Sequence, residues 1–219
     1  MRLRETLIGA WLFFSPTADA AINLFLNSGA SLATVEGTRT SQSQGISLSL
    51  QTLYQFEFLG LSLGVEAQQS KFKTVGTDYA KSSTVNFMGP SIGFSTEDKS
   101  RLLRILASAY VKRDYTASGE NYLTVNGKNY AYAVYESFEG KIPTSVRLDY
   151  LKKVASEKLS SDQSMYMGLS LDYLTWQLSK VRSEPSNSVE NVKPESSDIK
   201  VTTDILTIYT AYLVLGLNF

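Results

Sequence analysis

Apolar and polar side chains alternate along most of this chain with a period of two. In the segment 45–58, Ile46 and Leu48 lie on one face of an extended backbone, and Ser47 and Ser49 lie on the other. This alternation is typical of β-strands that bury one face. We therefore expect eight strands, at 21–35, 45–58, 61–72, 83–94, 101–125, 128–151, 163–182 and 199–219.

The connections between these strands alternate in length. Short turns are expected at 59–60, 95–100 and 155–161, and longer polar loops around 36–44, 73–82 and 183–198. Short turns at one end and long loops at the other are the layout of outer-membrane barrels. The pattern predicts an all-β fold, an eight-stranded antiparallel transmembrane up-and-down β-barrel, with ten strands as the alternative.

The faces opposite the apolar ones carry small and charged side chains, which suit the interior of a narrow barrel. Eight strands leave an interior just wide enough for side chains to fill, and charges buried there must be paired. A lumen charge network is expected from Glu57, Glu66, Arg104, Arg147, Asp149 and Asp172. A soluble β-sandwich or lipocalin-like barrel, with the two faces exchanged, is the alternative that periodicity leaves open.

Aromatic residues favour the membrane alternative. If the chain enters at the short-turn end, every second strand also finishes at that end. The aromatic residues near those strand ends are Phe56, Phe58, Phe94, Tyr150 and Phe219. Aromatic side chains gathered at one level form the interfacial girdle of a membrane barrel. A soluble sandwich has no need of such a girdle.

The first twenty residues form a separate piece. Arg2 and Arg4 precede a short apolar run at 7–14, and Ala18 and Ala20 frame a small-x-small cleavage site. This arrangement is typical of a Sec signal peptide. The apolar run is shorter than the ~20 residues of a spanning helix, which disfavours an uncleaved anchor. We expect residues 1–20 to be the signal peptide and residues 21–219 to be the barrel.

The C-terminal strand resembles the assembly signal of bacterial outer-membrane barrels. It ends on Phe219, with alternate hydrophobic residues before it and a tyrosine further back: Tyr209, Leu213, Leu215 and Leu217. The resemblance implies recognition by the barrel-assembly machinery. In strand number and length, residues 21–219 resemble small barrels of the OmpX and OmpA-transmembrane-domain type. That resemblance is architectural, so it implies no functional residues.

Asn126-Gly127 is a strong signal for a two-residue hairpin turn. Pairing the flanking strands from this turn places Arg104 opposite Asp149. The two strands are then about twice the ~9–11 residues that a membrane strand needs, so a hairpin at 113–142 is expected to protrude. Its tyrosines are candidates for extracellular binding of a protein or glycan: Tyr115, Tyr122, Tyr130, Tyr132 and Tyr135. The alternative is an inert solvated extension that shields the barrel from its surroundings.

Composition removes several kinds of chemistry. The chain has no cysteine and no histidine, which excludes disulfides, thiol catalysis and the commonest general base. The small barrels known as lipid A palmitoyltransferase, lipid A deacylase, outer-membrane phospholipase and omptin protease use a histidine, so their mechanisms do not transfer. A carboxylate pair remains possible in principle, with Glu57 and Glu66 as candidates. Lysine plus arginine balances aspartate plus glutamate at 21 each, which gives no reason to expect nucleic acid.

We therefore expect a non-catalytic surface barrel of the bacterial outer membrane, with no cofactor and no metal. Its expected contacts are outer-membrane lipids and lipopolysaccharide, the barrel-assembly machinery, and an extracellular protein or glycan. The first alternative is a narrow channel for small solutes or apolar molecules. The second is a histidine-independent lipid-modifying enzyme.

Overall fold

The computed structural model describes residues 20–37, 41–56, 60–74, 82–98, 100–125, 127–154, 163–185, 197–200 and 204–219. Apart from Ala20, the expected signal peptide lies outside these ranges, as do Glu57, Phe58 and Asn126. The signal peptide therefore stays a prediction. In the part of the chain so described, no helix is long and apolar enough to cross a membrane.

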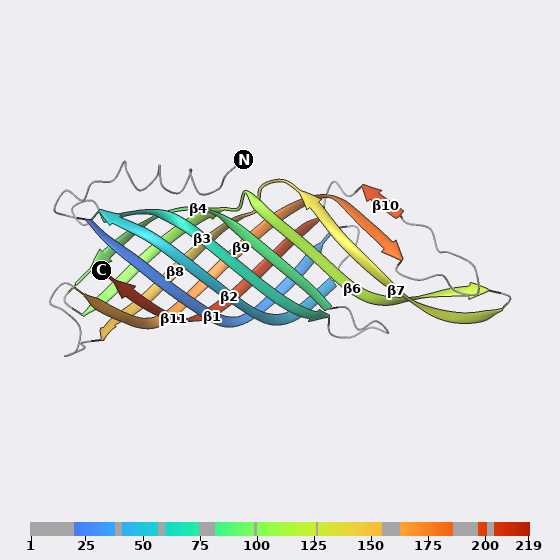
Figure 1. Cartoon of the computed structure of the whole chain (residues 1–219), viewed down its shortest axis with the longest axis horizontal. Coiled ribbons are helices and arrows are strands. Elements are labelled where there is room, and N and C mark those ends of the chain that lie inside the picture. Colours follow the sequence, from blue (N-terminus) through green and yellow to red (C-terminus); the bar gives the residue numbers. More distant parts are fainter. Residues whose placement is uncertain are drawn as a thin grey trace.

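Antiparallel strands make up a single closed ring (Figure 1). They are β1 (Ala20–Glu36), β2 (Ser41–Phe56), β3 (Leu61–Thr74), β4 (Ser82–Glu97), β5 (Arg101–Ala109), β6 (Lys112–Val125), β7 (Lys128–Gly140), β8 (Thr144–Val154), β9 (Ser164–Pro185), β10 (Ser197–Lys200) and β11 (Ile205–Asn218). Pairing of β11 with β1 closes the ring. Because β5 and β6, β7 and β8, and β10 and β11 continue one another, the ring has eight strands, as the alternation predicts.

The hairpin register is the one that Asn126-Gly127 predicts. Gly127 has a φ of 79°, the left-handed conformation that glycine adopts without a steric cost. Val125 pairs with Lys128, and the same register continues to Arg104 and Asp149. The predicted contact between Arg104 and Asp149 is therefore present.

The turn between β2 and β3 differs from the expectation. Phe56 pairs with Leu61, so the connection has four residues, 57–60, where two were predicted. Glu66 consequently lies opposite Gln51 and not opposite Leu53. A slip of two residues leaves every side chain on the same face, because side chains alternate with a period of two. The predicted faces are therefore correct although the predicted register of this pair is wrong.

The outward face of the ring is apolar. Exposed fractions reach 64% at Ile46, 62% at Leu171 and 69% at Leu213. Along β11 and the residue that follows it, exposed hydrophobic side chains run from Ile205 to Phe219, 42% and 56% exposed, a span long enough to include the ~9–11 residues that cross a membrane. Phe94, Tyr150 and Phe219 are likewise exposed near the end where the short turns lie, as expected for the girdle.

We call the end of the barrel that carries the short turns the turn end, and the opposite end the loop end. Near the loop end, β6 presents polar residues outward, among them Asp114 and Thr116. This strand thus lies beyond the apolar belt.

Asp98, in the β4–β5 turn at the turn end, accepts hydrogen bonds from the backbone N–H groups of Ser100 and Arg101. These bonds lower the pKa of Asp98 below its ordinary value.

Three strands of the ring, β5–β6, β7–β8 and β9, change near the loop end which alternate residues point into the lumen. Three residue steps separate Met88 from Ser91 on β4, whereas four separate Ser108 from Lys112 on the paired β5 and β6, so one residue is extra. Such a bulge turns the following side chains to the other face. The pairing of β7 with β9 is also irregular between Glu139 and Gly140. The expected uniform strands at 101–125 and 128–151 are therefore each divided.

The protruding hairpin is shorter than expected. β6 pairs with β4 as far as Ser118, and β7 pairs with β9 from Val134 onward. Among the described strands, only residues 120–125 and 128–133 pair with each other alone, and Figure 1 shows them extending past the rest of the barrel. The remainder of the expected 113–142 protrusion belongs to the barrel wall.

Candidate functional site

Two arginines occupy the centre of the lumen. Arg104 on β5 donates from Nε to Oδ2 of Asp149 at 2.7 Å, and its Nη2 lies 2.5 Å from the same oxygen. Its Nη2 also donates to Oε1 of Gln51 on β2 at 3.2 Å. The guanidinium lies 3.9 Å from the centre of the Phe25 ring. Arg104 is 1% exposed, so these partners take the place of water.

Arg147 on β8 is the second of these arginines. It forms an ion pair with Glu66 on β3, which is on the far side of the ring, and its Nη2 lies 3.6 Å from Oδ2 of Asp172. Nη1 donates to Ser49 Oγ at 3.2 Å. Glu66 also accepts hydrogen bonds from Ser49, Ser108 and Tyr110, at 2.7, 2.9 and 3.1 Å. The Glu66 carboxylate is therefore held by four side chains.

The expected charge network is thus assembled inside the barrel. The five members that the structure describes, Glu66, Arg104, Arg147, Asp149 and Asp172, are each at most 3% exposed. Three carboxylates face two guanidinium groups, which leaves this layer with an excess of one formal negative charge. The sixth predicted member, Glu57, lies outside the described residues.

Apolar clusters lie on both sides of the charged layer, which the predicted small and charged inner faces did not indicate. Toward the turn end, Phe25, Leu53, Leu102, Leu106, Leu151, Tyr166, Tyr212 and Val214 pack together. Gly216 makes room for the Phe25 ring, because a Cβ at Gly216 would lie 2.4 Å from it. Toward the loop end, Trp176 packs against Phe87 with ring centres 5.8 Å apart. Buried side chains of the two clusters and of the charged layer between them therefore lie along the lumen from the turn end to Trp176.

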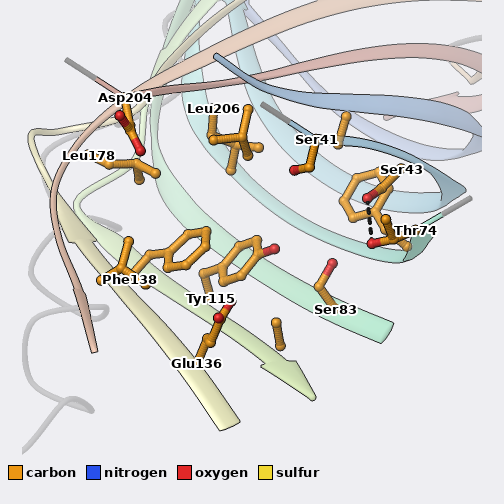
Figure 2. A pocket seen from close by; sticks show the side chains of 15 residues that line it. Ser41, Ser43, Thr74, Ser83, Tyr115, Glu136, Phe138, Leu178, Asp204 and Leu206 are labelled. Atoms are coloured by element: carbon orange, nitrogen blue, oxygen red, sulfur yellow. Dashed lines mark hydrogen bonds between the residues drawn. The ribbon is translucent and has the colours of Figure 1, made fainter. Parts of the chain in front are cut away.

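Above this second cluster the interior opens into a cavity of about 200 Å³ (Figure 2). All eight strands of the ring contribute to its lining, so the cavity lies on the barrel axis. Its apolar wall comes from residues such as Phe72, Leu178 and Leu206. Hydroxyl groups of Ser41, Ser43, Thr74 and Ser83 line the side away from Leu178. We call this space the loop-end cavity.

A pair of stacked rings forms one wall of the loop-end cavity. Tyr115 on β6 and Phe138 on β7 adjoin the paired residues Thr116 and Ser137, and their rings stack with centres 4.0 Å apart and planes 6° apart. Burial raises the pKa of Tyr115 to about 12, and a hydrogen bond with Ser83 opposes this rise. Tyr115 therefore stays a neutral phenol at physiological pH.

Two carboxylates border the loop-end cavity. Glu136 lies on β7 two residues from Phe138, and Asp204, which is 1% exposed, precedes β11. Figure 2 places Asp204 beside Leu178, and Glu136 below Tyr115. None of the lining residues that the structure describes is a lysine or an arginine. The part of the wall that the structure describes is therefore mainly apolar, with two carboxylates at its border.

The candidate tyrosines do not form one surface. Tyr115 faces the loop-end cavity, because the bulge exchanges the faces of β6. Tyr135 is 55% exposed on the outer side of β7. Tyr130 and Tyr132 are half-buried, and the side chain of Tyr122 lies outside the described part. Binding by the hairpin tyrosines stays a prediction.

The residues of the expected assembly signal lie on one face. Tyr209, Leu213, Leu215 and Phe219 point outward from β11 and are 42–69% exposed, and Leu217 is half-buried. Their recognition by the assembly machinery stays a prediction, because it concerns the unfolded chain.

Polar side chains inside and apolar side chains outside are the reverse of a soluble barrel. In lipid, a closed ring of strands satisfies every backbone polar group internally. The chain is a bacterial outer-membrane β-barrel. This arrangement rejects the soluble sandwich and the lipocalin-like barrel, whose apolar face would be inside.

Comparison with solved structures finds similarity at low sequence identity. Neisserial surface protein A is 12% identical with a TM-score of 0.43, and the match covers 89% of this chain and 95% of that one. The outer-membrane protease OmpT from Escherichia coli is 10% identical with a TM-score of 0.49, and the match covers 94% and 98%. Ail of Yersinia pestis, an attachment invasion locus protein, is 10% identical with a TM-score of 0.38, and the match covers 90% and 98%.

No protein-family model and no curated protein matches the sequence. The structural likenesses say nothing about what this barrel binds or does, so its function has to be argued from its own residues.

Proposed function

We propose that this outer-membrane barrel is non-catalytic, keeps its lumen closed, and acts at the cell surface through its loop end. Its outward belt contacts outer-membrane lipids, and lipopolysaccharide is the lipid expected around the outer half. The loop-end cavity and the protruding β6–β7 hairpin are the parts available to a partner from outside.

The observation that carries this proposal is the pair of arginines across the lumen. Arg147 connects β8 to Glu66 on β3, and Arg104 connects β5 to Gln51 on β2. In neither case are the two strands neighbours in the ring. Solute passage would require breaking buried ion pairs, which is costly because each charge would be left without its partner.

The setting of Glu66 supports a non-catalytic barrel. A general acid or base must reach a proton on the substrate. Glu66 is instead fully buried and accepts hydrogen bonds from Ser49, Ser108 and Tyr110 while it is paired with Arg147. Its carboxylate is fully used within the lumen.

Planar-bilayer recording of the refolded protein tests this function. We expect no steady conductance above that of the bare bilayer. The matched variant carries Arg104→Ser and Arg147→Ser, which remove both cross-lumen side chains but leave the apolar clusters on either side in place, so it should show at most brief, unsteady openings if it inserts. Stable ohmic conductance of the unaltered protein would contradict the closed lumen and support the narrow channel instead.

A further inference from the structure

We propose that the outer wall of the barrel carries a binding site for one phosphate-bearing lipid of the outer leaflet. An acyl chain of this lipid lies in a groove across β1–β4 and β6, and its phosphate contacts Lys112 and Lys71. This inference deepens the proposed contact with outer-membrane lipids and rests on that part of the proposed function alone. It does not depend on whether the lumen is closed.

The groove follows the pairing of five neighbouring strands. One row of directly paired outward residues crosses from β1 to β6 and consists of Leu26, Leu50, Ala67, Met88 and Lys112. The two leucines and Met88 are 46–52% exposed, and Ala67 is the smallest side chain of the row. The groove along this row has about 470 Å³. We call it the lysine groove, and its apolar part opens toward the hydrocarbon of the membrane.

The lysine groove rises from the apolar belt to the outer edge of the membrane. Ala67 is the sixth residue after Leu61, where β3 begins at the turn end. Lys71 is the tenth residue after Leu61, and Lys112 is the eleventh after Arg101, where β5 begins at the same end. A membrane strand needs ~9–11 residues, so both lysines lie at the level where the hydrocarbon ends.

Two lysines and two amides gather at this level. Lys112 lines the groove, and Lys71 is exposed two residues beyond Gln69 on the same face of β3. In the row between the lysines, Gln69 Nε2 donates to Asn86 Oδ1 at 2.8 Å. Neither lysine forms an ion pair within the described part of the chain. Asp114 also lines the groove, one row nearer the loop end, so the two lysines still leave an excess of one positive charge.

A lipid phosphate matches these donors. Lysine ammonium groups donate charge-assisted hydrogen bonds to phosphate oxygen atoms, and the Nδ2 of Asn86 can donate one more. A lysine also lays its methylene groups along an apolar surface while its ammonium stays at the interface. Hydrocarbon below and cations above are the order that an acyl chain and its phosphate require. A lipid without phosphate would leave the ammonium groups without an anion, and free phosphate would leave the apolar part of the groove unused.

A second groove on the outer wall supplies the comparison. It lies over β9, β11, β1 and β2 and has about 650 Å³. Tyr173 and Tyr209 line it, with ring centres 5.2 Å apart, and we call it the tyrosine groove. None of its described lining residues is a lysine or an arginine. The tyrosine groove can therefore accept an acyl chain but offers no cation to a phosphate.

Three probes separate the chain from the phosphate. Phosphatidic acid carries both, diacylglycerol with the same acyl chains lacks the phosphate, and inorganic phosphate lacks the chains. Native mass spectrometry of the refolded full chain, released from detergent micelles, counts the bound lipids and gives their dissociation constants. We expect one phosphatidic acid to bind about tenfold more tightly than diacylglycerol and than any further lipid. Inorganic phosphate in excess over the lipid should not displace it.

Variants locate the site. Lys112→Gln and Lys71→Gln should each weaken phosphatidic acid about fivefold and leave diacylglycerol unchanged. Lys152→Gln, at an exposed position near the turn end, is the charge control and should change neither. Ala67→Leu fills the lysine groove and should also weaken phosphatidic acid severalfold. Ala211→Leu makes the same change in the tyrosine groove and should leave the tight site intact. Heat-modifiability on a gel confirms that each variant is folded.

The outcomes distinguish the lipid site from the rest of the proposed function. If phosphatidic acid and diacylglycerol bind equally, or if Lys112→Gln and Lys71→Gln do no more than Lys152→Gln, the lysines only mark the membrane boundary and the lipid site is wrong. Displacement of the lipid by inorganic phosphate would show a site for the ion alone and would also overturn the assignment. Steady conductance of the unaltered protein would contradict the closed lumen and leave the lipid site standing.

Discussion

The interior of this barrel has two regions that solve the problem of buried polarity differently. In the membrane-spanning part, charged groups such as Arg147 and Glu66 are packed against each other with no space between them. At the loop end, the carboxylates Glu136 and Asp204 border a cavity lined mainly by apolar groups. The first region gains rigidity from paired charges, and the second contains a cavity of about 200 Å³.

The difference between these regions follows from strand geometry. Below Tyr110, the even-numbered residues of β5 point inward and bring Arg104 into the lumen. Beyond the bulge, the odd-numbered residues of β6 point inward, so Tyr115 and Ala117 face the lumen. Without the bulge, Asp114 and Thr116 would face it instead. One extra residue therefore exchanges a polar lining for an apolar one.

The largest effect is expected from removing a charge in the filled region. Arg147→Met leaves Glu66 and Asp172 buried without their cation, and should lower the free energy of unfolding by about 3–5 kcal/mol. Urea unfolding from phospholipid bilayers measures this. Adding Glu66→Gln should recover part of the loss, because the two side chains form one pair. Simple addition of the two single costs would show that they are not coupled.

Charge on the outer surface should separate the membrane-spanning region from the loop end. Leu171→Arg places a cation on the apolar belt and should cost about 2–4 kcal/mol if the position lies near the bilayer midplane. Thr116→Arg, on the polar outer side of β6, is the control and should cost close to nothing. Equal costs in the same bilayer unfolding assay would mean that the belt is misplaced.

The smallest effect compares how the two regions accept an added ring. Ser108→Phe forces a ring into the filled lumen and should destabilise by about 1–3 kcal/mol. Ala117→Phe puts the same ring into the loop-end cavity, where space exists, and should change stability by less than about 0.5 kcal/mol. If Ala117→Phe proves as costly as Ser108→Phe, the cavity is not open space in the folded protein.

Much of the lumen was predictable from residue types and spacing. The alternation of Leu103 and Ile105 with Arg104 determines which face is buried, because side chains of a strand point alternately to its two sides. Asn126-Gly127 determines the turn, and the turn determines that Arg104 meets Asp149. The loop-end cavity was not predictable, since its lining depends on bulges near residues 110 and 140 that leave no clear mark in the alternation.

By itself, the sequence determined the fold class, the faces of the strands in the apolar belt and the Arg104–Asp149 contact, because each depends on local period or on one turn. Only the tertiary structure decided that Arg147 reaches Glu66 across the ring, that β2 and β3 are joined through four residues, and that Tyr115 turns inward to stack on Phe138. These features depend on closure of the ring and on one extra residue in a strand. Local periodicity predicts neither ring closure nor the extra residue, because both arise from how distant strands are paired.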